Sequence, residues 1–118
     1  MADIEVRKYT ADESVLRDLF PGGGIQFIHT ENVTFAAWSF EAGTRVPAHT
    51  HPHEQITQCV AGALILEMPD EEIVLHAGET AVIPGGVEHG ARADTASRGV
   101  DIFHPVREDY KKLGGEDK

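Results

Sequence analysis

Cysteine is almost absent from the sequence, since Cys59 is the single thiol among 118 residues. One cysteine excludes an intrachain disulfide, so a hydrophobic core must hold the fold together, and Cys59 is expected to belong to it. The chain also lacks an apolar run near the roughly 18 residues that cross a bilayer. Residues 1–5, MADIE, lack the basic and apolar regions of a signal peptide. We therefore expect a cytoplasmic protein that does not bind membranes.

Basic residues are scarce as well. Lys and Arg number 10 against 20 Asp and Glu, which gives a formal net charge of −10. Nucleic acids and anionic membrane surfaces bind proteins through basic patches that release counterions, so neither is an expected partner. A chain of this length forms one domain that can bury roughly two-thirds of its unfolded surface. We expect a single domain over residues 1–118.

The sequence does contain a pair of histidines in an extended stretch. His49 and His51 lie two residues apart, and Pro47 and Pro52 keep this stretch out of a helix. Because residues i and i+2 of an extended chain point to the same side, the two imidazoles converge. Neutral imidazole is a common ligand of transition metals, and two imidazoles supply half of a four-ligand set.

Two further candidate ligands follow along the chain. Gln55 begins a run to Ala61 that reads as a strand, and its amide oxygen can reach the same point as the imidazoles. His89 lies in the turn-rich stretch 83–90. A lone histidine is more often a surface or packed core residue than a ligand. We expect that ordinary role for the other histidines, which are His29, His53, His76 and His104.

Short strands separated by turns recur along most of the sequence. Alternation of apolar and polar residues predicts antiparallel strands at 25–29 and 33–40, joined by a tight turn at Glu31 and Asn32. In the strand that begins at Gln55, residues 55, 57 and 59 are expected to face inward. Further strands are predicted at 63–68, 73–76, 80–83 and 99–104. Such spacing, with glycine turns and no long helix, is typical of an antiparallel sandwich or barrel.

The first 20 residues predict two different elements. Ile4 and Val6 alternate with charged residues, which suits a first strand within 3–10. Asp12 and Glu13 precede apolar residues up to position 20, and Pro21 follows. Acidic residues at the start and proline after the end favour one or two turns of helix here.

The histidine region resembles the first motif of the cupin family, G-x5-H-x-H-x3-[E/Q]-x6-G, at residues 43–62. The second cupin motif, G-x5-P-x-G-x2-H-x3-N, is matched at residues 78–93 except at its last position, which is Ala93. The matching residues are Gly43, His49, His51, Gln55, Gly62, Gly78, Pro84, Gly86 and His89. The resemblance implies an all-β double-stranded β-helix, a jelly-roll barrel, to which the pattern at residues 12–20 adds one short N-terminal helix. It also implies a metal held by His49, His51, Gln55 and His89.

The end of the sequence resembles a narrower group. Residues 101–110, DIFHPVREDY, look like the D-x-F-x-P-x-R-E-D-Y ending of KdgF-type cupins. Those enzymes convert 4,5-unsaturated monouronates from pectin and alginate breakdown into open-chain keto acids. Carried over to this chain, Asp101 would be the acid/base, Phe103 the wall of the sugar pocket and Arg107 the grip on the substrate carboxylate. His104 stands where that group has a small residue such as Ser.

The resemblance implies a divalent transition metal, and a shell of nitrogen and oxygen donors admits Zn, Ni, Mn or Fe. The expected ligand is a sugar acid or another small acid. A homodimer is expected from the open edge of the first strand and from the habit of similar cupins. Three alternatives remain open on this fold. They are a dioxygenase or isomerase of another small acid, a non-catalytic sensor or binding module, and a jelly-roll subunit without metal.

Overall fold

The computed structural model describes residues 5–13, 15–17 and 19–113. Strands dominate these ranges, and a single short helix follows them. The strands are β1 (Val15–Arg17), β2 (Gly23–His29), β3 (Thr34–Phe40), β4 (Thr44–His49), β5 (Glu54–Ala61), β6 (Ala63–Glu67), β7 (Glu72–His76), β8 (Thr80–Ile83), β9 (His89–Ala93) and β10 (Ser97–His104). The helix is α1 (Glu108–Leu113).

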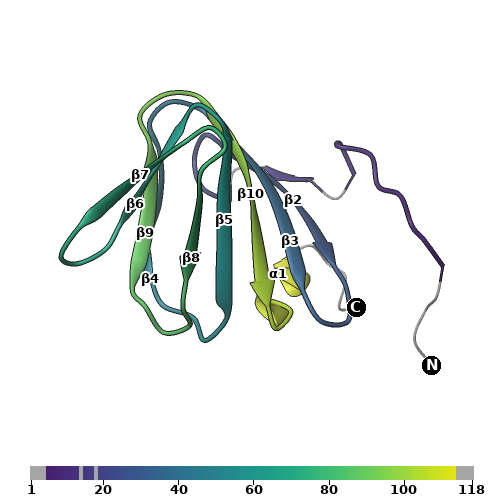
Figure 1. Cartoon of the computed structure of the whole chain (residues 1–118). Helices are drawn as coiled ribbons and strands as arrows, with labels where there is room; N and C mark the ends of the chain where they lie inside the picture. The colour runs from purple at the N-terminus through teal and green to yellow at the C-terminus, as the bar shows by residue number, and fades with distance from the viewer. Residues whose placement is uncertain (1–4, 14, 18, 114–118) are drawn as a thin grey trace.

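Two antiparallel sheets face each other and form a jelly-roll barrel (Figure 1). The larger sheet has the strand order β1-β2-β3-β10-β5-β8, and the smaller has the order β4-β9-β6-β7. The all-β barrel expected from the strand pattern is therefore confirmed. The predicted hairpin at 25–40 is also confirmed, since β2 and β3 pair from Gly23 and Phe40 to His29 and Thr34.

The inward and outward faces follow the alternation expected from the sequence. In β5, Gln55, Thr57 and Cys59 are 6%, 1% and 0% exposed, whereas Ile56 and Val60 are 39% and 46% exposed. Burial raises the pKa of the Cys59 thiol, which is therefore protonated and packed as a small apolar residue. Cys59 is a core residue, as predicted.

The barrel interior contains an apolar core, which includes aromatic rings, and also buried polar side chains. Trp38 and Phe40 stack with ring centroids 4.7 Å apart, and Leu64, Leu66 and Leu75 of the smaller sheet are buried with them. Apolar packing of this kind supplies the free energy that a disulfide would otherwise contribute.

The glycines shared with the cupin motifs occupy turns that other residues rarely adopt. Four of them have positive φ angles, between +80° and +92°: Gly43, Gly62, Gly78 and Gly86. A side chain at such φ values meets the backbone, so glycine is the ordinary residue there. The motif spacing therefore reflects turn geometry at the ends of the strands that carry the histidines.

At Gly99, glycine is needed for a different reason, because the neighbouring atoms leave no room for a side chain. A Cβ built there would lie 2.2 Å from Cζ2 of Trp38 and 2.4 Å from the carbonyl oxygen of Gln58. Gly99→Ala should therefore lower the free energy of unfolding by about 3 kcal/mol or more, as overpacking of a rigid core does. Urea denaturation of Gly24→Ala is the matched control, because its nearest neighbours lie at 3.6 and 3.9 Å. Equal midpoints for the two variants would contradict this packing.

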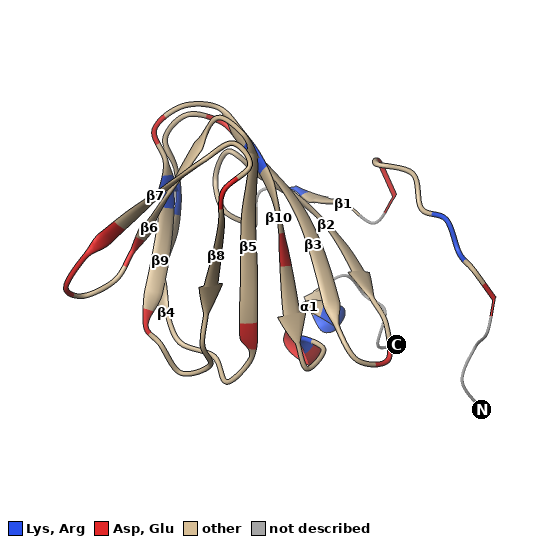
Figure 2. Cartoon of the chain, viewed as in Figure 1, with Lys and Arg blue, Asp and Glu red and all other residues tan. Residues whose placement is uncertain are grey.

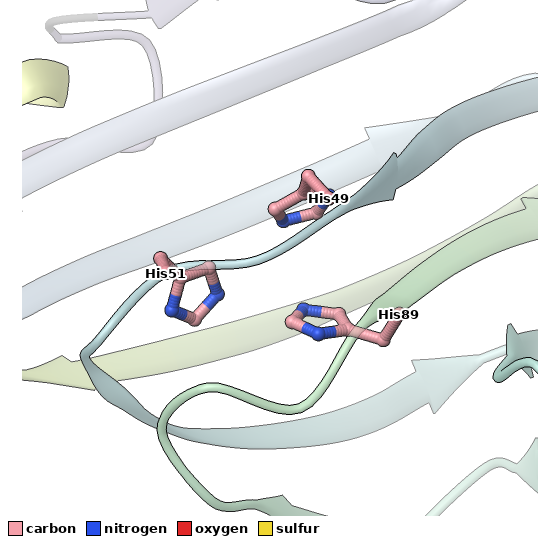
Figure 3. A group of neighbouring side chains, drawn as sticks. All are labelled: His49, His51 and His89. Atoms are coloured by element: carbon pink, nitrogen blue, oxygen red, sulfur yellow. The ribbon is translucent and has the colours of Figure 1, made fainter.

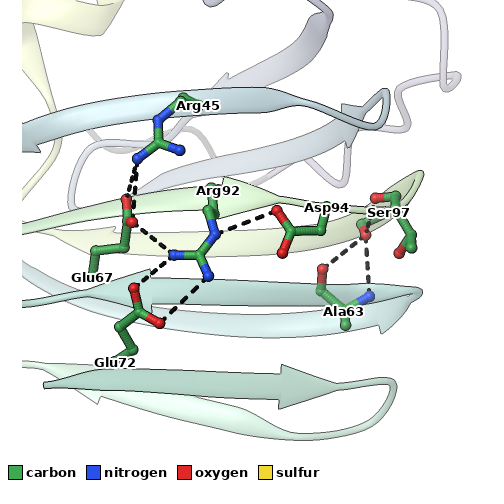
Figure 4. A network of polar contacts seen from close by, with 8 residues as sticks. Arg45, Ala63, Glu67, Glu72, Arg92, Asp94 and Ser97 are labelled. Atoms are coloured by element: carbon green, nitrogen blue, oxygen red, sulfur yellow. Dashed lines mark hydrogen bonds and ion pairs between the residues drawn. The ribbon is translucent and has the colours of Figure 1, made fainter.

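The outer surface of the smaller sheet carries a network of charges (Figure 4). Arg92 of β9 contacts Glu67 of β6 at 2.8 Å and Glu72 of β7 at 2.7 Å. Arg45 of β4 contacts the same Glu67 at 3.3 Å. The network joins all four strands of this sheet across its solvent side, where each pair contributes modestly to stability.

Acidic residues otherwise lie mainly at strand ends and in loops (Figure 2). β10 is an exception, because its fifth residue, Asp101, lies within the strand. The described residues include no helix with the length and hydropathy needed to span a membrane.

The N-terminal helix predicted within residues 12–20 is wrong. Residues 15–17 form β1, in which Leu16 pairs with Ile25 and packs against the core. The side chain of Gln26 donates hydrogen bonds to the carbonyl oxygens of Thr10 and Glu13, which hold the preceding residues as a turn. Tertiary contacts with β2 thus override the local helical pattern.

Three other elements differ from the prediction. The first strand expected at 3–10 is not formed over residues 5–10, and residues 3 and 4 lie outside the described part. In Figure 1 the segment from residue 5 leads away from the barrel. β9 and α1 were not predicted; β9 is short and rich in small residues, and α1 follows a proline-containing turn.

Candidate metal centre

Three histidines meet between the two sheets (Figure 3). His49 ends β4 and His89 begins β9, and the register of these strands places the two residues opposite each other. His51 follows in the connection to β5 and is 7% exposed. One ring nitrogen from each histidine lies within 4.8 Å of the other two. Two distant parts of the sequence therefore form one cluster of nitrogen donors.

The backbone fixes the proton on each ring. In every case Nδ1 lies within hydrogen-bond distance of a carbonyl oxygen two residues away in the sequence. The pairs are His49 with Pro47 (2.9 Å), His51 with His53 (3.1 Å) and His89 with Val87 (2.8 Å). Because a carbonyl oxygen only accepts, each Nδ1 carries the proton and donates it. The lone pair of each Nε2 is left for the centre of the cluster.

Gln55 reaches this cluster from the opposite sheet. Its Nε2 donates a hydrogen bond to Oγ1 of Thr57 at 2.8 Å, which directs its Oε1 toward the histidines. That oxygen lies 3.1 Å from Nε2 of His51 and 3.1 Å from Nε2 of His89. Gln55 is 6% exposed and thus belongs to the interior.

The donor set fits a cation. Burial, and then the charges of Arg107 and His89, lower the pKa of His51 to about 4. Burial is also the main cause that lowers the pKa of His89. When the rings are neutral and Nδ1 carries the proton, each Nε2 has only a lone pair to offer. The Nε2 atoms of His51 and His89 and the Oε1 atom of Gln55 are then all acceptors, and no proton lies between them. A divalent ion between these nitrogen and oxygen donors satisfies all of them together.

The other described histidines lie outside the cluster. The ring centroid of His53 is 5.5 Å from that of His51. His53 contacts the cluster through its backbone carbonyl oxygen, which accepts the hydrogen bond from Nδ1 of His51. His76 and His104 are exposed, and His29 contacts a threonine of β3. Their positions agree with the ordinary roles expected for them.

Among the described residues of the larger sheet, Asp101 is the only acidic residue at an inward-facing position. It pairs with Thr57 in the register of β10 and β5, two residue pairs from the pairing of Phe103 with Gln55. Two residues along a strand span about 7 Å, so the carboxylate and the Gln55 amide share one region of the interior. Asp101 is partly buried, and Thr57 opposite it is 1% exposed.

The Asp101 carboxyl group titrates near neutral pH. Burial raises its pKa to about 6, against the opposing effects of hydrogen bonds from Thr57 and Trp38 and of the Arg107 charge. The indole Nε1 of Trp38 lies 3.3 Å from Oδ1 of Asp101. A carboxyl group with this pKa can both take and give a proton at physiological pH.

Arg107 is buried beside the centre, with 5% of its surface exposed. Its guanidinium lies 3.9 Å from the ring centroid of Tyr110 and 4.9 Å from that of Phe103. Nε and Nη2 contact the carboxylate of Asp109 at 3.0 and 2.7 Å. Nη1 is buried without a hydrogen-bond partner among the described atoms. A buried N–H group without a partner is costly, which makes Arg107 a candidate for contact with an anionic ligand.

Phe103 joins the two parts of this site. It is 3% exposed, and its ring meets the ring of His51 edge-on with centroids 5.6 Å apart. The predicted site residues of the strands and of the His51 connection thus lie together in the barrel interior, and Arg107 lies against Phe103 beyond the end of β10. Thr57 and Trp38 were not predicted to have a functional role, although strand parity placed Thr57 on the inner face. Nothing local in the sequence marks Trp38, because only the register of β3 with β10 brings it to Asp101.

Comparison with known proteins agrees with this geometry. The profile of the Cupin_2 family, described as a cupin domain, matches residues 36–103. That match covers both histidine segments and most of β10. The comparison with curated protein sequences found no match.

Among solved structures, KdgF from Halomonas sp. is 32% identical, with a TM-score of 0.74, over 80% of this chain and 90% of that one. An RmlC-like cupin from Shewanella frigidimarina is 25% identical, with a TM-score of 0.80, over 90% and 96%. Ectoine synthase from P. lautus is 16% identical, with a TM-score of 0.77, over 95% and 86%, and this last likeness concerns the fold alone.

Proposed function

The chain belongs to the Cupin_2 family of cupin domains, and from that premise we propose that it is a metal-dependent enzyme acting on a small sugar acid. The specific reaction proposed is the conversion of 4,5-unsaturated monouronates to linear keto acids. The observation that carries the proposal is the placement of Asp101 and Arg107 beside the donor cluster. The charge of Arg107 affects the pKa values of His51, His89 and Asp101, so these groups lie within electrostatic reach of one another.

The residues of this chain suit each part of that reaction. The free Nη1 of Arg107 is a charged donor for the uronate carboxylate. Asp101 removes the proton from the hydroxyl group at C1, the C1–O5 bond breaks, and C1 becomes an aldehyde. The same carboxyl group then returns the proton to C4, so that the enol at C5 becomes a ketone. Atoms balance, because the product is an isomer of the substrate.

Phe103 and the donor cluster have supporting roles. Phe103 presents an apolar wall that limits water beside the reacting carbons. His49, His51, Gln55 and His89 would hold the divalent ion. When bound, such an ion supplies Lewis acidity to a substrate oxygen.

The direct test follows the ultraviolet absorbance of 4,5-unsaturated galacturonate, which is lost when the conjugated double bond disappears. Protein loaded in parallel with Zn, Ni, Mn or Fe should accelerate this loss, and chelator-treated protein should not. Iron-loaded protein that consumes oxygen and leaves the uronate unchanged would contradict the proposal and favour a dioxygenase of another small acid. Tight binding of the uronate without turnover would instead indicate a binding module.

Arg107→Gln is expected to raise KM for the uronate by about 10- to 100-fold, because a hydrogen bond to a charged group contributes roughly 1.5–3 kcal/mol. Arg107→Lys keeps the positive charge without the planar fork and should give an intermediate KM. Steady-state kinetics on both variants measures the effect. A KM in Arg107→Gln equal to that of the wild type would remove Arg107 from substrate binding.

A further inference from the structure

Thr57 connects the donor cluster to Asp101. Its side chain is 1% exposed and lies between two partners on the inner face of the larger sheet. Oγ1 accepts a hydrogen bond from Nε2 of Gln55 at 2.8 Å. Thr57 lies opposite Asp101 in the register of β5 and β10, and its hydroxyl group lowers the pKa of the Asp101 carboxyl group. Trp38 donates to the same carboxylate from the neighbouring strand. Asp101 and Thr57 are therefore cross-strand neighbours between the indole of Trp38 and the amide of Gln55.

The direction of these bonds follows from counting protons. A threonine hydroxyl group has one proton, and an ionised carboxylate can only accept. With Asp101 ionised, the hydroxyl proton is directed to Asp101, and the oxygen lone pairs of Thr57 can only accept from the amide. The NH2 group of Gln55 must then face Thr57, so Oε1 must face the histidines. The opposite amide orientation would direct N–H groups at the cluster and remove its oxygen donor.

We propose that Thr57 is the positioning residue that holds the Gln55 amide in its metal-binding orientation and takes its own orientation from Asp101. The proposal rests on the metal-binding part of the proposed function and is independent of the uronate reaction. Partners of metal ligands commonly determine affinity in this way, and their loss typically weakens metal binding about 10- to 100-fold.

The test measures the affinity of the apo protein for Zn²⁺ and Ni²⁺ by competition with a chromophoric chelator. Thr57→Val keeps the shape without the hydroxyl group and should weaken both affinities about 10- to 100-fold. Thr57→Ser restores the hydroxyl group and should bind nearly as the wild type does. Thr44→Val is the matched control, since Thr44 is also 1% exposed but bonds to the backbone of Glu41. Its metal affinity should be unchanged.

Wild-type affinity in Thr57→Val, or equal weakening in the Val and Ser variants, would overturn the proposal. If Thr57→Val does not fold, Thr57→Ala replaces it in the same comparison with Thr57→Ser. Because no uronate is present, failure of the catalytic proposal leaves this result unaffected. Loss of all metal binding in the wild type would contradict both.

Discussion

Replacing Asp101 with asparagine is expected to lower kcat for the uronate about 10²- to 10⁴-fold, the range that a placed proton donor contributes. Asparagine has nearly the same shape and can still bond with Thr57 and Trp38, but its amide cannot take a proton from the C1 hydroxyl group. The variant should therefore still bind one metal ion per chain. Initial rates of absorbance loss, together with metal analysis of the same sample, measure both quantities.

The pH dependence of the wild type provides a second readout of this residue. Asp101 must be ionised to accept the first proton, and its pKa is raised to about 6. Activity should therefore fall as the pH decreases through about 6, because the protonated carboxyl group cannot act as the base. Asp101→Asn should lose this acidic limb along with most of its activity. Unchanged turnover in the variant would remove Asp101 from the mechanism.

His89→Ala is expected to weaken metal affinity by more than the 10- to 100-fold typical of residues behind the ligands, since it removes a donor itself. Its Nε2 lies 3.1 Å from Oε1 of Gln55, so the remaining donors would also lose a near neighbour. Chelator competition with Zn²⁺ measures the change. The purified variant should contain far less than one metal ion per chain.

A matched control separates this loss from a general effect of removing a histidine. His76 is exposed on the outer side of β7, and His76→Ala should keep wild-type affinity and stoichiometry. His49→Ala should behave like His89→Ala. If the His89 variant retained one tightly bound ion, the assignment of this imidazole as a ligand would be wrong.

Much of the fold could be predicted because its signals are local. Strand alternation placed Gln55 and Cys59 on the inner face, and glycines marked the turns before and after the histidine strands. The spacing of His49 and His51 already indicated that their rings point to the same side. Their convergence with His89 depended on motif resemblance, because no local pattern reports that β4 pairs with β9.

The failures have a common physical cause. Residues 12–20 have an apolar pattern that suits a helix, yet Leu16 gains more by pairing with Ile25 at the edge of a sheet. The contact of Trp38 with Asp101 likewise exists only because β3 and β10 pair across 63 positions of sequence. Long-range strand register decides such contacts, and a single sequence carries no direct record of it.

X-ray absorption spectroscopy at the metal edge of the reconstituted protein tests the central claim most directly. The account predicts one ion per chain, with three imidazole nitrogens and an oxygen donor at about 2.0–2.2 Å. In Gln55→Ala the protein oxygen should be replaced by water, whereas His89→Ala should lower the imidazole count to two. A wild-type spectrum with fewer than three imidazoles, or one unchanged by His89→Ala, would contradict the account.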